Sequence, residues 1–231
     1  MKRSLQCAFG TVALLVSSSA WAQTFGEKGQ LAISAERLFG FVHDSSTYTA
    51  NGVDSTTKTD SFTFLSSTLA PVPLQAGNNI GGMAYSAPRV AGDYFVIDHL
   101  SVGAALGYSH ISFSVPATAN AEVSTSGDSW TFAPRAGYSF LFNDIVGIWP
   151  RAGFTYRTIS AGNSSNDVFA LTIEAPFTFT VIPHVVFTAA PTLDIGLSGS
   201  QNTSDGNGRT VSNDFTATEI GIQTALIATI W

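Results

Sequence analysis

The feature that most constrains the fold of this chain is an alternation of apolar residues with polar or small ones. Between Asp167 and Val181 the odd positions are apolar, including Phe169, Leu171 and Ile173, while the even positions include Thr172, Glu174 and Thr178. Successive side chains of a β-strand point to opposite faces, so this period of two predicts a strand with one apolar and one polar face. A helix would instead repeat its apolar residues every three or four positions.

The same pattern recurs in pairs of segments joined by short turns. The expected turns lie at Ile97-Asp98-His99, around Asn143-Asp144 and at Ile182-Pro183-His184. They predict three hairpins and therefore six strands. Two further strands, near Gln30 to Val42 and from about Phe215 to Trp231, bring the total to eight.

Longer polar stretches separate the hairpins. Residues 116–128, 160–166 and 198–213 are rich in Ser, Thr, Asn and Gly, and are expected to be exposed loops. Short turns that alternate with long loops are typical of a closed antiparallel transmembrane β-barrel, with periplasmic turns and extracellular loops. Residues 44–87 contain a further strand-like run, Ser61 to Leu65. We interpret this region as a β-rich extracellular extension of the first strand pair, and ten strands are the alternative.

Composition supports a barrel in a membrane. Only 11% of the 231 residues are charged, and the mean hydropathy is +0.22, yet no apolar run is long enough for one of several membrane helices. A β-barrel satisfies both observations because each strand alternates lipid-facing and inward-facing residues. The net charge of −6 argues against a nucleic-acid partner.

The N-terminal segment predicts export from the cytoplasm. Lys2 and Arg3 precede a short apolar stretch, and Ala20-Trp21-Ala22 has the small-x-small pattern of a signal-peptidase site. We expect residues 1–22 to be a cleaved secretory signal peptide and residues 23–231 to be one barrel domain. The expected location is the bacterial outer membrane.

Alternation also predicts which residues line the lumen. A charged set should face inward: Glu36, Arg89, Asp93, Arg135, Arg151, Arg157, Glu174, Asp194 and Glu219. Buried ions are costly unless paired, so we expect ion pairs that close a lumen already narrow at eight strands. An open small-solute pore is the alternative.

Aromatic residues should form two girdles at the membrane surfaces. One girdle is expected near the turns (Tyr94, Tyr138, Phe140, Trp149, Phe177, Phe179 and Phe187) and one farther along the strands (Tyr108, Trp130, Phe132, Phe154, Tyr156 and Phe169).

Three segments share a Pro-Arg-x-Gly-aromatic pattern, loosened in the first copy. They are Ala87 to Tyr94, Ala133 to Tyr138 and Trp149 to Phe154. With the hairpin Tyr94 to Gly103, they resemble the small OmpA-like and OmpX-like outer-membrane barrels of Gram-negative bacteria. The resemblance implies a structural or surface-interaction role through the loops. It also implies outer-membrane lipid and lipopolysaccharide as surroundings, and periplasmic chaperones and the barrel-assembly machinery as partners during biogenesis.

In that family an aromatic final residue belongs to the assembly signal, which here would be Trp231. Alternation places Trp231 on the face opposite Ile230, so either a bulge shifts the register or the residue lies beyond the strand.

Signals for catalysis are few. His110 and Ser112 are similar to the His-x-Ser pair of outer-membrane lipid A deacylases, where His is the base and Ser the nucleophile. The sequence identifies no carboxylate to complete such a triad, so we expect no enzyme, with a lipid-modifying enzyme as the alternative. We expect no cofactor and no metal site.

Overall fold

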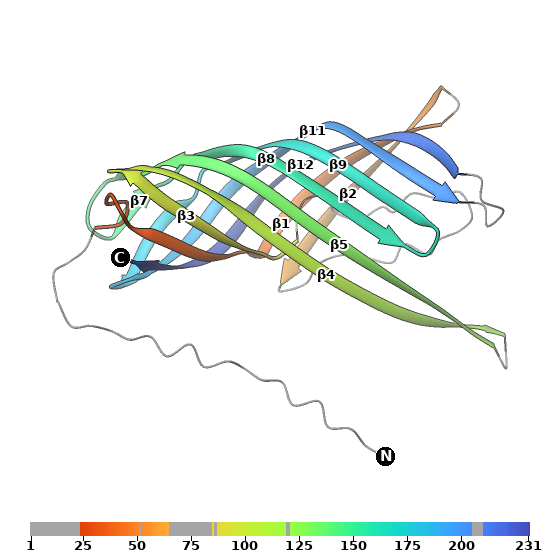
Figure 1. Ribbon diagram of the computed structural model, residues 1–231, viewed down its shortest axis with the longest axis horizontal. Helices are drawn as coiled ribbons and strands as arrows, with labels where there is room; N and C mark the ends of the chain where they lie inside the picture. The colour runs from red at the N-terminus through yellow and green to blue at the C-terminus, as the bar shows by residue number, and fades with distance from the viewer. Residues whose placement is uncertain (1–23, 51, 65–84, 86, 119–120, 205–209) are drawn as a thin grey trace, which may run out of the picture.

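The computed structural model describes residues 24–50, 52–64, 85, 87–118, 121–204 and 210–231, with backbone only for residues 63 and 111–125. Eight long antiparallel strands form a closed barrel, in the order β12-β1-β3-β4-β5-β8-β9-β11, with β11 pairing back to β12 (Figure 1). The barrel strands are β1 Leu31–Ala50, β3 Arg89–Ile97, β4 Leu100–Thr118, β5 Ala121–Tyr138, β8 Arg151–Ala161, β9 Ser164–Glu174, β11 Val185–Ser204 and β12 Thr210–Ile230. Eight strands and antiparallel closure are confirmed.

Three short strands prolong the wall at the turn end. They are β6 Phe140–Leu141, β7 Val146–Ile148 and β10 Phe177–Ile182, and they continue β5, β8 and β9 toward the turns. The C-terminus lies at this turn end, and the long hairpins project from the other end (Figure 1). No helix long and apolar enough to cross a membrane occurs among the described residues.

The remaining strand, β2 Val53–Phe64, forms a hairpin with the second half of β1. It pairs with β1 alone, on the side of β1 where β3 pairs nearer the turn end. It therefore adds no strand to the closed barrel. This agrees with an extension of the first strand pair rather than with a ten-stranded barrel.

The long polar stretches are not loops through most of their length. Strands β4 and β5 remain paired up to Thr118 and Ala121, and β8 and β9 up to Ala161 and Ser164. The prediction of loops was therefore wrong for these stretches. Ser- and Thr-rich segments here complete hairpin ladders, whose backbone hydrogen bonds do not require an apolar face.

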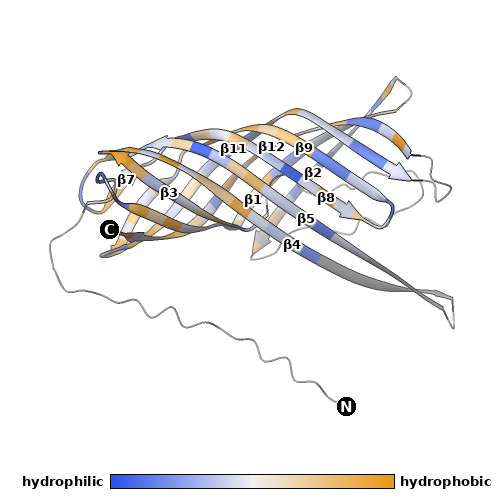
Figure 2. Cartoon of the chain, viewed as in Figure 1, coloured by the Kyte–Doolittle hydropathy of each residue, from blue (hydrophilic) through white to orange (hydrophobic). Residues whose placement is uncertain are grey.

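Outward-facing side chains form an apolar belt around the barrel. Figure 2 shows that the hydrophobic residues gather toward the turn end and the hydrophilic ones toward the projecting hairpins. Trp130, Phe132 and Tyr138 are exposed on this outer wall, as expected of membrane girdles. Trp149 is the exception: it is fully buried inside the barrel, so its assignment to a girdle was wrong.

Candidate functional site

The interior of the barrel is the candidate site, and its turn end is filled by aromatic rings. Phe25 lies edge-on against Phe95 and Trp149, with ring centroids 5.4 and 5.2 Å apart. All three rings are buried. Trp149 also donates from Nε1 to Ser101 Oγ at 3.1 Å, which satisfies its only donor inside the lumen.

Phe25 is held there by the segment before β1, which folds back into the lumen. Gly29 N donates to Phe95 O at 2.8 Å, and His99 N donates to Gly26 O at 2.7 Å. Gly26 has φ +95°, a backbone conformation that favours glycine, and a Cβ there would collide with Ser139 Oγ. Residues 24–30 thus form a stopper at the turn end, which we call the N-terminal stopper.

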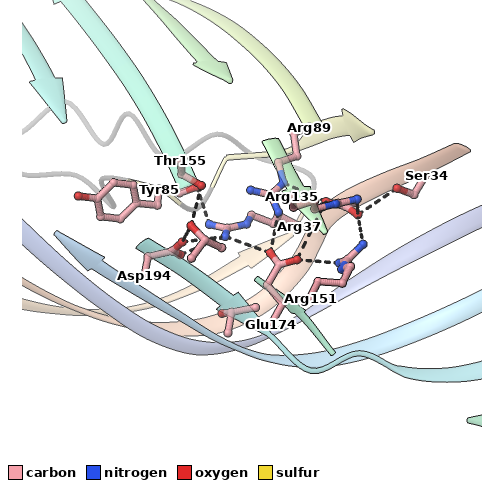
Figure 3. Close-up of polar contacts among 12 residues, drawn as sticks. Ser34, Arg37, Tyr85, Arg89, Arg135, Arg151, Thr155, Glu174 and Asp194 are labelled. Atoms are coloured by element: carbon pink, nitrogen blue, oxygen red, sulfur yellow. Dashed lines mark hydrogen bonds and ion pairs between the residues drawn. The ribbon is translucent and has the colours of Figure 1, made fainter. Parts of the chain in front are cut away.

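A charged layer follows farther into the barrel, and two glutamates organise it (Figure 3). Glu36 accepts from Arg89 Nε at 2.9 Å, from both terminal nitrogens of Arg135 at 2.7 Å, and from Arg151 Nη1 at 2.8 Å. Glu174 binds Arg89 Nη2 at 2.6 Å and Arg151 Nη2 at 2.7 Å. Each carboxylate is therefore shared between guanidinium groups from different strands.

Asp93 and Asp194 complete this layer. Asp93 binds Arg135 through two hydrogen bonds, one of them from Nε at 2.9 Å. Asp194 pairs with Arg37 at 3.0 Å and accepts a hydrogen bond from Thr172. Pairing of this kind offsets the cost of removing the charges from water, which an isolated ion could not recover.

Arg37 is a member of the layer that the sequence did not predict. Alternation assigns Glu36 and Arg37 to opposite faces, yet both are buried inside the barrel. The register between β1 and β12 shifts between Glu36 and Gly40, and Arg37 has φ +55° at this bulge. The bulge turns two consecutive charged side chains inward.

The repeated Arg-x-Gly pattern explains how so many guanidinium groups fit. In the pairing of β5 with β8, Arg135 lies opposite Gly153 and Gly137 lies opposite Arg151. A Cβ on Gly153 would approach Arg135 Cβ to 2.8 Å, and one on Gly137 would approach Arg151 Cγ to 2.7 Å. The two copies therefore interlock, each glycine leaving room for the arginine stem of the other strand.

Tyr85 forms a third level, on the side of the projecting hairpins. Its ring belongs to a buried cluster with Val168 and Ala170 of β9 and with Phe215 and Ala217 of β12. Its hydroxyl donates to Ala217 O at 3.4 Å, so the side chain occupies the lumen beside these strands. Its backbone N donates to Glu219 Oε1 at 2.7 Å, and Arg37 Nη1 donates to its carbonyl at 2.6 Å.

Arg157 and Glu219 lie at this Tyr85 level rather than among the other predicted charges. Arg157 donates from Nε to Ser129 Oγ at 2.8 Å and attracts Glu219 electrostatically. The other seven predicted residues all join the charged layer. Five guanidinium groups and five carboxylates thus occupy the two levels, and Asp44, hydrogen-bonded by Ser46, is a further buried carboxylate beside Glu219 in the strand register.

One small cavity lies beside the charged layer. The cavity lined by Arg37, Arg151, Thr192 and Gln223, among others, has a volume of about 10 Å³. That is the room one water molecule needs.

The outer wall carries a second polar arrangement, around His110. Asp128 lies opposite His110 in the register of β4 and β5, and its Oδ1 is 2.8 Å from His110 Nδ1 and 2.8 Å from Tyr108 Oη. Hydrogen bonds from His110 and then Tyr108 hold the pKa of the Asp128 carboxyl below its ordinary value. The sequence did not identify this carboxylate, because the partner comes from the neighbouring strand. Ser112 follows two residues along β4, opposite Ser126.

Two further expectations can be placed. β12 ends at Ile230, so Trp231 lies beyond the strand and is exposed, and of the two alternatives left open at this residue the structure shows the second. Within the described residues, no group of three or more His, Cys, Asp or Glu side chains could hold a metal ion. The expected signal peptide, residues 1–22, lies outside the described residues.

The sequence matches no protein-family model and no curated protein. Solved structures are similar in fold. AlkL, an outer-membrane protein solved by solid-state NMR in lipid bilayers, aligns with a TM-score of 0.53 and 10% identity over 90% of this chain and 93% of AlkL. OprG from Pseudomonas aeruginosa aligns with a TM-score of 0.50 and 11% identity over 90% of this chain and 99% of OprG. The outer-membrane protease OmpT from Escherichia coli aligns more weakly, with a TM-score of 0.39 and 8% identity over 92% of this chain and 100% of OmpT.

The similarity to AlkL and OprG shows that the chain has the fold of small bacterial outer-membrane β-barrels. The apolar outer wall, bounded by aromatic residues, is the surface that such a fold presents to lipid. The chain is therefore an outer-membrane barrel.

Proposed function

We propose that this protein is a closed outer-membrane barrel that conducts no solutes and acts through its projecting hairpins, as a structural or surface-interaction protein. The observation that carries the proposal is the filling of the lumen at three successive levels. These levels are the N-terminal stopper, the charged layer and the ring of Tyr85.

Each level opposes a passing solute in a different way. The aromatic rings leave no polar path, and the ion pairs would have to break before a side chain could move aside. Separating one partner of a buried ion pair costs about 3–5 kcal/mol. A small-solute pore would instead need an inward face of small polar residues without such pairs.

The hairpins offer the surface for interaction. β1 with β2 and β4 with β5 project beyond the barrel (Figure 1) and contain many Ser and Thr residues.

Conductance in planar lipid bilayers tests the proposal. The purified full-length protein, inserted and shown by its heat-modifiable mobility to be folded, should give no steady current above the lipid alone. A stable, large ionic conductance from folded protein would overturn it.

One observation favours a second candidate function, a lipid hydrolase. Asp128 binds Nδ1 of His110, which leaves Nε2 as the nitrogen that could take a proton from a serine nucleophile. The three residues His110, Ser112 and Asp128 come from adjacent strands at the outer edge of the apolar belt. The acyl ester of an outer-leaflet lipid would be the substrate.

Mass spectrometry of outer-membrane lipids tests this candidate. Cells that express the wild-type protein should lose an acyl chain from their lipids, and cells with Ser112→Ala or Asp128→Asn should not. Identical lipid spectra with and without the wild-type protein would exclude hydrolysis of those lipids.

A further inference from the structure

The outward face of four neighbouring strands is ordered in rows that change from apolar to polar. In the register of β4, β5, β8 and β9, Leu106, Phe132, Tyr156 and Phe169 form one row. The next row toward the hairpin tips is Tyr108, Trp130, Thr158 and Asp167. The row beyond it is His110, Asp128, Ser160 and Ser165. We call the two upper rows the outer polar face.

Contacts within the outer polar face hold its side chains in place. Tyr108 packs against Trp130, with ring centroids 4.5 Å apart, and donates its hydroxyl to Asp128. On the next strand pair, Tyr156 of the apolar row below donates from Oη to Asp167 Oδ1 of the outer polar face at 3.0 Å. Two tyrosine–aspartate pairs therefore line the upper border of the apolar belt.

The charges of this face select among lipid headgroups. None of the eight positions of the outer polar face is Lys or Arg, and two are Asp. Phosphate headgroups call for arginine or lysine, and carboxylates repel them. Hydroxyl groups, in contrast, donate well to carboxylates, and a sugar ring packs its C–H face on an exposed aromatic ring. Trp130 is 60% exposed and presents such a ring.

We propose that the outer polar face binds the sugar headgroup of an uncharged glycolipid in the outer leaflet. The sugar packs on Trp130, and its hydroxyls donate to Asp128 and Asp167. The acyl chains run along the apolar row below, over Leu106 and Phe132. Closure of the lumen does not enter this proposal, and neither does cleavage of the bound lipid.

Native mass spectrometry of the full-length protein in detergent tests the proposal. The probes are monogalactosyl diacylglycerol, phosphatidylglycerol and phosphatidylcholine with identical acyl chains, mixed in equal amounts. The wild-type protein should retain the galactolipid about tenfold more than either phospholipid, which is the discrimination one hydrogen bond to a charged group provides. Equal retention of the three lipids, or preference for phosphatidylglycerol, would overturn the proposal, and neither depends on a variant that folds.

Variants then assign the site. Asp128→Asn and Trp130→Ala should each reduce the preference for the galactolipid several-fold. Tyr138→Ala is the matched control, since Tyr138 is an exposed aromatic residue on the same face of β5 at the opposite end. A preference that survives both substitutions, or that Tyr138→Ala removes equally, would place the sugar elsewhere and contradict the assignment. Retention that required Mg²⁺ and vanished with a chelator would indicate phosphate bridged by a cation, which also contradicts it.

Discussion

At the scale of single residues, Glu36 shows how closely the lumen charges depend on one another. Its carboxylate contacts three guanidinium groups, so Glu36→Gln leaves the charged layer with an excess of buried positive charge. We expect a loss of about 3–5 kcal/mol in the free energy of unfolding. Urea unfolding in lipid vesicles measures this loss. Asp144→Asn in an exposed turn is the control and should change stability little.

The hydrogen bonds to Asp128 can be tested by titration. Because His110 and Tyr108 stabilise the charged carboxylate, its pKa lies below the ordinary value of about 4. The contribution of these bonds is present above that ordinary value and is lost as the pH falls through the lowered pKa. His110→Leu should raise the pKa of Asp128 toward its ordinary value, as measured by carbon-13 NMR of the carboxyl group.

His43→Leu provides the matched control for that titration. His43 forms a similar pair with Asp60 on β1 and β2, at 2.7 Å, and has no contact with Asp128. It should leave the Asp128 titration unchanged. An Asp128 pKa that stays the same in His110→Leu would contradict the role given to His110.

The sequence correctly predicted which side chains point inward wherever the strand alternation is uninterrupted. Glu174 and Asp194 lie in regular strands, and their inward orientation follows from the period of two. Trp149 shares the parity of Arg151, which predicts an inward position, but its aromatic type suggested a membrane girdle. The parity was decisive, because Phe25 and Phe95 supply an apolar environment inside the lumen. Arg37 could not be predicted, since a bulge has no signature in the alternation.

At the scale of elements, the pairing of β5 with β8 depends on glycine opposite arginine. Gly153→Ala would place a Cβ against Pro134 O and the backbone of Arg135. We expect it to destabilise the barrel by about 1–3 kcal/mol through overpacking. Gly92→Ala is the matched control, because a Cβ there meets nothing within 4 Å and Gly92 also lies in a barrel strand.

Urea unfolding in lipid vesicles compares the free energy of unfolding of the two alanine variants. Equal stability of Gly153→Ala and Gly92→Ala would show that the interlocked pattern is not a packing requirement. The repeated pattern is visible in the sequence. That each glycine lies opposite the arginine of the other copy follows only from the pairing register of β5 with β8.

Strand ends were the least predictable elements. The paired segments extend well past the apolar alternation, because Ser and Thr continue a ladder outside the membrane as readily as apolar residues do inside it. Trp231 lies after the last ladder pair, Leu31 with Ile230. Its part in assembly stays a prediction.

At the scale of the whole molecule, the three levels of the lumen lie in series, so one open level should not open the barrel. Phe25→Ala removes a ring of the N-terminal stopper, and Tyr85→Ala removes the ring of the third level. Each single variant leaves the charged layer intact and should remain non-conducting in planar bilayers.

A conducting barrel should require the loss of all three levels. The combined variant carries Phe25→Ala, Tyr85→Ala, Glu36→Ala, Asp93→Ala, Arg135→Ala and Arg151→Ala, which removes two guanidinium groups together with the two carboxylates that pair with them and so leaves the charged layer without an excess charge. Its folded fraction, identified by heat-modifiable mobility, should show steady currents, and the variant without the Tyr85 and Phe25 substitutions should not. Conductance in either single aromatic variant would mean that the charged layer does not seal the lumen and that one aromatic level holds it closed.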